Sequence, residues 1–192
     1  MSLTLGKFTE HGDTSAIYQG ERINVFGGIP NEEGTARIIR GGNRRKQQTY
    51  GIVSEVKSPS RYRIKPPCPY FGPCTGCQWQ HIAYEYQPEL KRNYVLKQLS
   101  HYPELHNATV NPTVPSPQQF NYRNHARFTV RKNGSVGFIN RMSRQFIRVS
   151  GCMLMSQWIN TTLKLLQNKT EETSQLTIRY GINSTEWLIQ PI

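Results

Sequence analysis

Residues 66–81 read PPCPYFGPCTGCQWQH, and this stretch divides the chain into two parts. Three cysteines, Cys68, Cys74 and Cys77, follow one another with five and then two residues between them. The two prolines before Cys68 cannot continue a β-ladder, so regular structure is interrupted there. We therefore predict an irregular cysteine-bearing loop that opens a second domain, residues 66–192, after a first domain, residues 1–65.

The first domain is predicted to be a small antiparallel β-barrel of the oligonucleotide-binding type. Short β-rich runs alternate with Gly, Asn and Pro signals. We expect turns at Gly27-Gly28 and at Gly41-Gly42, because glycine adopts positive φ angles at little cost. The expected strands are residues 15–18, 22–26, 35–39 and 50–56.

The second domain is predicted to mix α-helices and β-strands. Apolar spacing favours a helix over 89–99 with Pro88 in its first turn, and a second helix over 155–167. Four prolines indicate an irregular connection over 101–118. The second helix should bury one face, formed by Trp158, Ile159, Leu163 and Leu166. The expected strands are 126–131, 135–139, 145–150, 175–179 and 187–190, the first two joined through Asn133-Gly134. The fold class is therefore β-rich α+β.

The composition favours a polyanionic partner. The chain has 24 Lys and Arg against 12 Asp and Glu, a formal charge of +12. Such an excess attracts anions, and nucleic acid leads the candidates. No apolar stretch approaches the roughly 20 residues that span a bilayer, and MSLTLGKFTEHGD lacks the pattern of an export signal. We expect a cytoplasmic monomer that binds RNA and no membrane.

The cysteine spacing favours a metal cofactor. Cys152 lies 75 residues after Cys77 and completes a set of four. Structural disulfides are rare in a reducing compartment. Three thiolates on one loop plus one distant thiolate suit a four-iron, four-sulfur cluster better than zinc, whose structural ligands usually come in two short-spaced pairs. Zinc, and unligated or disulfide-bonded cysteines, stay open as alternatives. For His81 a structural hydrogen-bonded role is favoured over ligation.

Two segments, CPYFGPCTGCQWQH and NYRNHARFTV…GSVGFINRMSRQFIRVSGCML, resemble the S-adenosylmethionine-dependent RNA uracil-5-methyltransferases, in particular the iron–sulfur-containing ribosomal RNA members. The resemblance extends over essentially all 192 residues. It implies that the first domain is a TRAM domain, an RNA-binding barrel. It also implies that Cys68, Cys74, Cys77 and Cys152 hold a four-iron, four-sulfur cluster, which strengthens iron–sulfur against zinc.

The catalytic parts of that family are missing from this sequence. All four cysteines are committed to the cluster, no G-x-G-x-x-G motif occurs, and Asp13 is the only aspartate. We therefore expect no catalytic residue here, and S-adenosylmethionine only in a longer form with a C-terminal methyltransferase domain. We expect a truncated or fragmentary member that is inactive alone and binds structured rRNA, or tRNA. A stand-alone RNA-binding iron–sulfur or zinc module without catalysis is the alternative.

Basic residues supply the candidate RNA contacts. One group surrounds an expected turn of the barrel, where flexible cations could reach successive phosphates. An ordinary solvated charged turn remains an alternative there. A second group lies among aromatic residues of the second domain, a mixture suited to phosphate pairing and base stacking. The expected RNA-binding residues are Arg37, Arg40, Arg44, Arg45, Lys46, Arg123, Asn124, Arg127, Arg131 and Arg141.

Overall fold

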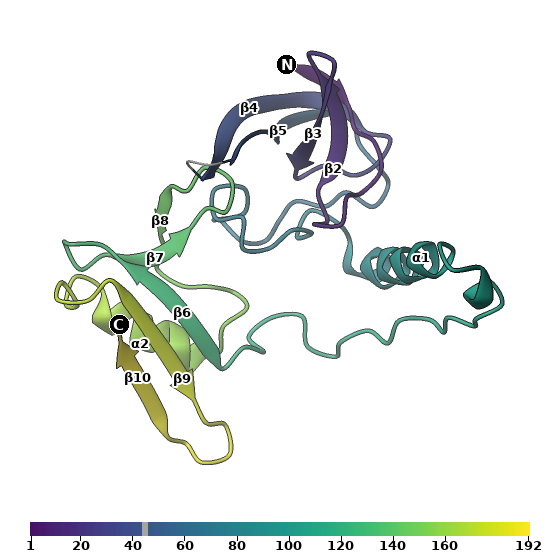
Figure 1. Ribbon diagram of the computed structural model, residues 1–192. Helices are drawn as coiled ribbons and strands as arrows, with labels where there is room; N and C mark the ends of the chain where they lie inside the picture. Colours follow the sequence, from purple (N-terminus) through teal and green to yellow (C-terminus); the bar gives the residue numbers. More distant parts are fainter. Residues whose placement is uncertain (44–45) are drawn as a thin grey trace. The chain divides into compact units, whose positions relative to one another are not determined.

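The structure is a computed structural model that describes residues 1–43 and 46–192. It contains two β-sheets and two α-helices in the described residues, which confirms the β-rich α+β class (Figure 1). The chain separates into two compact units, each assembled from three segments. The first unit comprises residues 1–38, 51–67 and 78–117, and the second comprises 39–50, 68–77 and 118–192.

The first sheet is strongly curved and has the strand order β1-β4-β5-β3-β2 (Figure 1). Its hairpin β2–β3 pairs Tyr18 with Glu21, and Gln19 and Gly20 both have positive φ, as a tight two-residue hairpin turn requires. Alternate side chains point inwards, so Leu5, Ile23 and Val25 form a buried core. The strands are β1 (Ser2–Thr4), β2 (Thr14–Tyr18), β3 (Glu21–Phe26), β4 (Glu33–Asn43) and β5 (Lys46–Ser58).

The two predicted glycine turns have different outcomes. Gly27 has φ +82°, as the prediction requires. Gly41 lies inside β4, so the predicted turn at Gly41-Gly42 is wrong. A Cβ atom at Gly41 would lie 2.0 Å from the Met142 carbonyl oxygen. Glycine is therefore needed at position 41 for a close approach of two backbones and not for a bend.

The predicted first helix is confirmed as α1 (Gln87–Leu99), which has Pro88 in its first turn. A short 3-10 helix, η1 (Tyr84–Tyr86), leads into it, and another, η2 (Pro103–Leu105), follows it. No residue of α1 is buried, so its apolar side chains do not form part of a core in the described structure.

The second sheet has the strand order β10-β9-β6-β7-β8, and α2 (Gln157–Leu166) packs on one of its faces. Ser156 caps α2 by accepting a hydrogen bond from the Ile159 N–H. Ile159 and Leu163 are fully buried, whereas Trp158 is 56% exposed, so its predicted place on the buried face is wrong. The strands are β6 (His125–Val130), β7 (Val136–Ile139), β8 (Phe146–Arg148), β9 (Gln175–Tyr180) and β10 (Trp187–Pro191).

In the parts of the chain that the structure describes, no helix is long and apolar enough to cross a membrane.

Candidate functional site

The cysteine loop is irregular, as predicted, and is held by hydrogen bonds to the rest of the second unit. Gly72 and Thr75 have positive φ, which turns the chain sharply between Cys68 and Cys77. The Asn140 amide donates to the Pro73 carbonyl (2.7 Å), and the Arg141 N–H donates to the Thr75 hydroxyl (3.0 Å). The loop conformation is therefore set by side chains from a distant part of the sequence.

The fourth cysteine is held by α2. The Asn160 side chain accepts a hydrogen bond from the Cys152 N–H (2.8 Å) and donates to the Cys152 carbonyl (3.1 Å). Tyr70, from the cysteine loop, accepts a hydrogen bond from the Ser150 N–H (2.9 Å), two residues before Cys152. One tyrosine thus joins the loop to the segment that carries the distant cysteine.

The Cys74 thiol lies close enough to Cys68 and Cys152 for both to affect its protonation. Burial raises the pKa of the Cys74 thiol, and the neighbouring Cys152 and Cys68 raise it further, against a lowering contribution from the Gly76 N–H. All four cysteines are half-buried and none forms a disulfide.

The four cysteine thiols are the candidate ligands for a metal cofactor. Within residues 1–43 and 46–192, no group of three or more His, Cys, Asp or Glu is arranged to hold a metal ion. Zinc would require all four sulfurs at about 2.3 Å from a single centre. In a four-iron cluster each cysteine binds a different iron, so the thiolates stand further apart. A zinc ion and a four-iron, four-sulfur cluster both stay candidates for the four thiols.

His81 has a structural role in the first unit, as favoured from the sequence. It is 1% exposed, and its Nε2 lies 3.0 Å from the Gly28 carbonyl oxygen. Burial lowers the pKa of His81 to about 4, so the ring is neutral at pH 7 and Nε2–H donates this bond. The four cysteines belong to the second unit.

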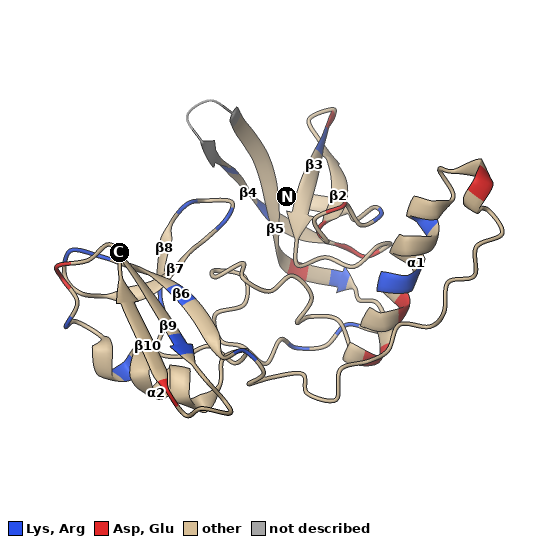
Figure 2. Ribbon diagram, turned by 60° about the horizontal axis from the view of Figure 1, so that its bottom comes forward, with Lys and Arg blue, Asp and Glu red and all other residues tan. Residues whose placement is uncertain are grey.

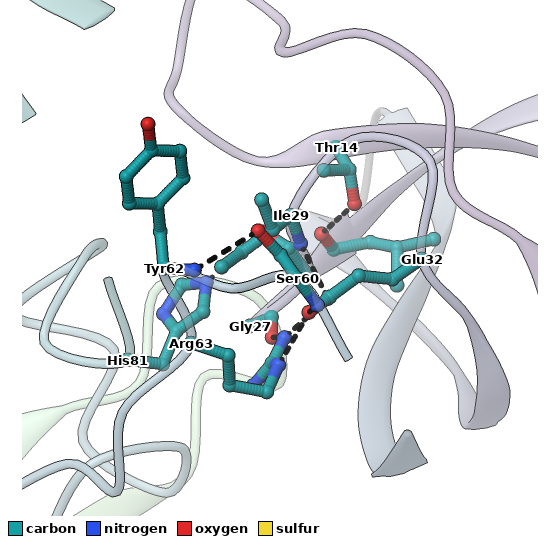
Figure 3. Close-up of polar contacts among 10 residues, drawn as sticks. Thr14, Gly27, Ile29, Glu32, Ser60, Tyr62, Arg63 and His81 are labelled. Carbon is teal, nitrogen blue, oxygen red and sulfur yellow. Dashed lines mark hydrogen bonds and ion pairs between the residues drawn. The ribbon is translucent and has the colours of Figure 1, made fainter. Parts of the chain in front are cut away.

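A buried ion pair lies near His81, and the sequence reasoning missed it (Figure 3). The Arg63 guanidinium donates to both carboxylate oxygens of Glu32, at 2.6 and 2.5 Å. The N–H groups of Ile29 and Ser60 also donate to this carboxylate. Burial raises the pKa of Glu32, but these hydrogen bonds outweigh burial and hold it below its ordinary value. Glu32 thereby ties the β3–β4 connection to the segment that follows β5.

The face of the second sheet opposite α2 is basic. We call it the open face and define it by His125, Arg127, Arg131, Arg148 and Arg179. Phe128 and Val130 of β6 are buried while Arg127 is exposed, so alternate side chains of β6 point to opposite faces of the sheet. His125 is paired with Arg179 across β6 and β9, and Arg148 with Gly137 across β7 and β8. The Arg131 guanidinium lies 5.0 Å from the Phe146 ring centroid.

No strand of this sheet contains an acidic residue. The second unit carries 14 Lys and Arg against 3 Asp and Glu, a formal charge of +11, and the first unit accounts for the remaining +1. Figure 2 shows blue segments on β9 and in the loop beside β8. The charge that suggested a polyanionic partner therefore belongs almost entirely to the second unit.

The other predicted RNA-binding residues are distributed over both units. Arg37 and Arg40 are exposed on β4, in the first and the second unit respectively. Arg123 is exposed beside Tyr122, and Asn124 is half-buried, its amide donating to the Tyr180 carbonyl (3.1 Å). Arg141 is half-buried beside the cysteine loop. Arg44, Arg45 and the Lys46 side chain lie outside the described residues.

The expected RNA-binding residues did not include three members of the open face, His125, Arg148 and Arg179. For Arg179 a signal was present, because in QLTIRY the polar residues alternate with Leu176, Ile178 and Tyr180. The alternation shows that Arg179 points away from the core, but only the pairing of β9 with β6 places it beside the other cations.

No family model matches the chain. A protein of Aquifex aeolicus named an uncharacterized RNA methyltransferase is 31% identical over 160 residues, which are 83% of this chain and 37% of that protein. A protein of Geobacter sulfurreducens with a similar name is 31% identical over 164 residues, 83% of this chain and 32% of its own length. A third, from Enterococcus faecalis, is 29% identical over 177 residues, 88% and 38% of the two chains. The chain thus spans about a third of the length of these curated relatives. Over most of its own length it is similar to proteins named as RNA methyltransferases.

Proposed function

We propose that this chain is the RNA-binding N-terminal part of an S-adenosylmethionine-dependent RNA uracil-C5 methyltransferase that acts on rRNA more readily than on tRNA. The observation that carries the proposal is the open face. The planar guanidinium group of arginine can donate two parallel hydrogen bonds to one phosphate. A sheet face with several arginines and no carboxylate on its strands therefore suits a phosphate backbone. The similarity to RNA methyltransferases makes RNA the natural polyanion.

The curved first sheet is proposed to be a TRAM-type RNA-binding barrel. Its support is a five-stranded curved sheet with a closed apolar core, the architecture that the resemblance implies. The first unit has a formal charge of only +1, because residues 39–50, which carry Arg40, Arg44, Arg45 and Lys46, belong to the second unit. We therefore propose that the second unit, with this segment, supplies most of the phosphate contacts.

The four cysteines are proposed to hold a four-iron, four-sulfur cluster with a structural role. When bound, such a cluster would cross-link the loop to the segment around Cys152. Three contacts support this proposal. Asn160 is hydrogen-bonded to the Cys152 backbone, Tyr70 joins the loop to the segment before Cys152, and the Gly76 N–H points towards the Cys74 sulfur. Methyl transfer itself would need S-adenosylmethionine, a nucleophile and a base from polypeptide that this chain lacks.

The salt dependence of RNA binding tests the proposal. Binding of an rRNA fragment should weaken steeply with salt, and Arg127→Gln and Arg179→Gln should each reduce the slope of log K against log salt by about 1. Lys97→Gln is the matched control, because Lys97 is an exposed cation on α1 of the nearly neutral first unit. Equal slopes for all three variants would exclude the open face from the RNA interface.

The cofactor is tested separately. Protein purified without oxygen should contain about four irons per chain and absorb near ~400 nm, and Cys77→Ala should abolish both. Stoichiometric zinc without this absorbance would replace the iron–sulfur proposal by a zinc site.

The alternative function is a stand-alone RNA-binding module. It would be the correct description if the protein bound RNA but did not form part of a methyltransferase.

A further inference from the structure

Three aromatic side chains gather at one edge of the second unit, away from the cysteine loop in sequence. We call them the aromatic corner: Trp158, Tyr180 and Trp187. The Trp158 ring stacks on Tyr180, with centroids 5.5 Å apart and planes at 29°. Trp187 lies 4.8 Å from Tyr180 and stands nearly perpendicular to Trp158, at 77° and 6.4 Å.

The corner arises from two elements that meet on the same side of the sheet. Trp187 is paired with Tyr180 across β10 and β9, so both rings lie on the face that α2 covers. Trp158 belongs to the first turn of α2, next to the buried Ile159, and is rotated about 100° from it around the helix. Tyr180 is 8% exposed and forms the base, whereas Trp158 and Trp187 are 56% and 41% exposed.

Two exposed indoles at nearly right angles form a surface suited to a flat ligand. A planar base could stack on one ring while its edge contacts the other, and stacking of a base on an aromatic ring contributes about 1–3 kcal/mol. Tyr180 holds both rings in place, so little conformational entropy is lost when a base arrives.

Backbone hydrogen bonds join Arg123 and Asn124 to the elements of the corner. The Asn124 carbonyl accepts the Tyr180 N–H (2.9 Å), and the Arg123 carbonyl accepts the Ser156 N–H (2.8 Å) directly before α2. The exposed Arg123 therefore lies on a segment that is hydrogen-bonded both to β9, which carries Tyr180, and to the start of α2, which carries Trp158. A cation in this position can contact the phosphate of a nucleotide whose base is stacked.

We propose that the aromatic corner binds an unpaired RNA base. This inference rests on the proposed function and specifies the RNA that is bound. That RNA contains a single-stranded or looped-out nucleotide and is not a continuous duplex. A base inside a duplex is stacked on its neighbours and cannot offer a free face to a protein ring.

Charge favours RNA over a protein at this surface. The exposed Leu188 and Ile189 of the edge strand β10 would also suit a polypeptide. Yet the corner belongs to a unit with a formal charge of +11, which attracts a polyanion over the whole surface. Glu186, next to Trp187, is the one carboxylate adjacent to the corner in sequence, and Glu186→Gln should therefore strengthen binding at low salt.

Binding of the 192-residue chain to two matched RNAs tests the proposal: a single strand and a duplex that contains the same strand. Trp158→Leu and Trp187→Leu should each weaken single-strand binding about 10-fold, leave duplex binding unchanged and keep the salt slope. Replacement by Phe should restore most of the affinity. The control is Ile182→Ser, which removes an exposed apolar side chain from the same hairpin without removing a ring. Both tryptophans are exposed, so the variants should fold, and unchanged melting temperatures would verify this.

The outcomes separate the inference from the proposed function. If the tryptophan variants bind single strands as tightly as the wild type while Arg127→Gln and Arg179→Gln weaken binding, the corner is not a base site and the proposed function stands. If the wild type binds neither RNA, both fail. If the tryptophan variants convert a dimer into a monomer in sedimentation without changing RNA affinity, the surface docks a second copy of the chain and the inference is overturned.

Discussion

At the scale of single residues, Glu32 is a buried carboxylate that is held by several hydrogen-bond donors. Its side chain is 1% exposed and accepts hydrogen bonds from a guanidinium and two backbone N–H groups (Figure 3). A carboxylate removed from water is tolerated only where such partners replace the lost hydration. The Arg63 side chain is 19% exposed and keeps some contact with solvent, so the pair stabilises the fold without burying two full charges.

Removal of the Glu32 charge should destabilise the protein. Glu32→Gln leaves Arg63 without its anion and should reduce the free energy of unfolding by about 3 kcal/mol. Urea unfolding at pH 7 measures this. Glu33→Gln is the control, because Glu33 is exposed on β4 and should change stability by less than about 0.5 kcal/mol. Similar losses in both variants would show that the buried pair contributes nothing specific.

His81 should make the fold sensitive to mild acid. Its pKa falls from an ordinary value of 6.5 to about 4 in the folded chain, mainly through burial. As pH falls below 6.5 the unfolded chain binds a proton that the folded chain refuses, so stability is lost progressively down to about pH 4. The loss should reach about 3 kcal/mol. His81→Gln should flatten the dependence of the unfolding free energy on pH in this window, and an unchanged slope would contradict the assignment.

At the scale of elements, α2 both covers a sheet and holds a cysteine. Its buried face, Ile159 and Leu163, fixes its position on the second sheet, and this brings Asn160 to the Cys152 backbone. An irregular segment has few hydrogen bonds of its own, so a helix side chain that satisfies its N–H and C=O groups determines its conformation. The placement of Cys152 is therefore a consequence of helix packing.

Loss of the Asn160 amide should disturb the cysteine set. Asn160→Leu removes three hydrogen bonds to residues 152–155 and should lower iron content and the absorbance near ~400 nm after anaerobic purification, without unfolding the unit. Thr161→Val, on the exposed side of α2, should leave both unchanged. Full iron loading of Asn160→Leu would mean that the cluster positions Cys152 without help from the helix.

At the scale of the whole molecule, the division of charge is the main result. The second unit carries a formal charge of +11 and the first unit +1. The chain also spans about a third of the length of its curated relatives. Both facts support the proposed function, in which the second unit attracts the RNA and further polypeptide supplies the chemistry.

The native mass tests this view. Antibodies raised against the 192-residue chain should detect, in the source cell, a protein of roughly twice 22.1 kDa, as one additional domain of ordinary size would give. That protein should form 5-methyluridine in RNA when S-adenosylmethionine is supplied, and the 192-residue chain alone should not. A native band at 22.1 kDa would support a stand-alone RNA-binding module instead.

The sequence by itself determined most of the elements. β-rich runs between turn signals predicted β2, β3, β6, β9 and β10 within a few residues, because strand propensity and turn residues act locally. Prolines and glycines predicted the irregular cysteine loop for a similar reason, because they restrict or free the local φ angle. The basic character of the protein also follows from composition alone.

Tertiary structure decided what depends on partners distant in sequence. Gly41 reads as a turn residue, yet it lies in a strand, where the Met142 carbonyl leaves no room for a Cβ atom. Trp158 reads as core, yet the packing angle of α2 turns it to the surface beside Trp187. Arg179 joins Arg127 only through the pairing of β9 with β6. Local pattern fixes the direction of each side chain, whereas strand order and helix packing fix its neighbours, and binding depends on neighbours.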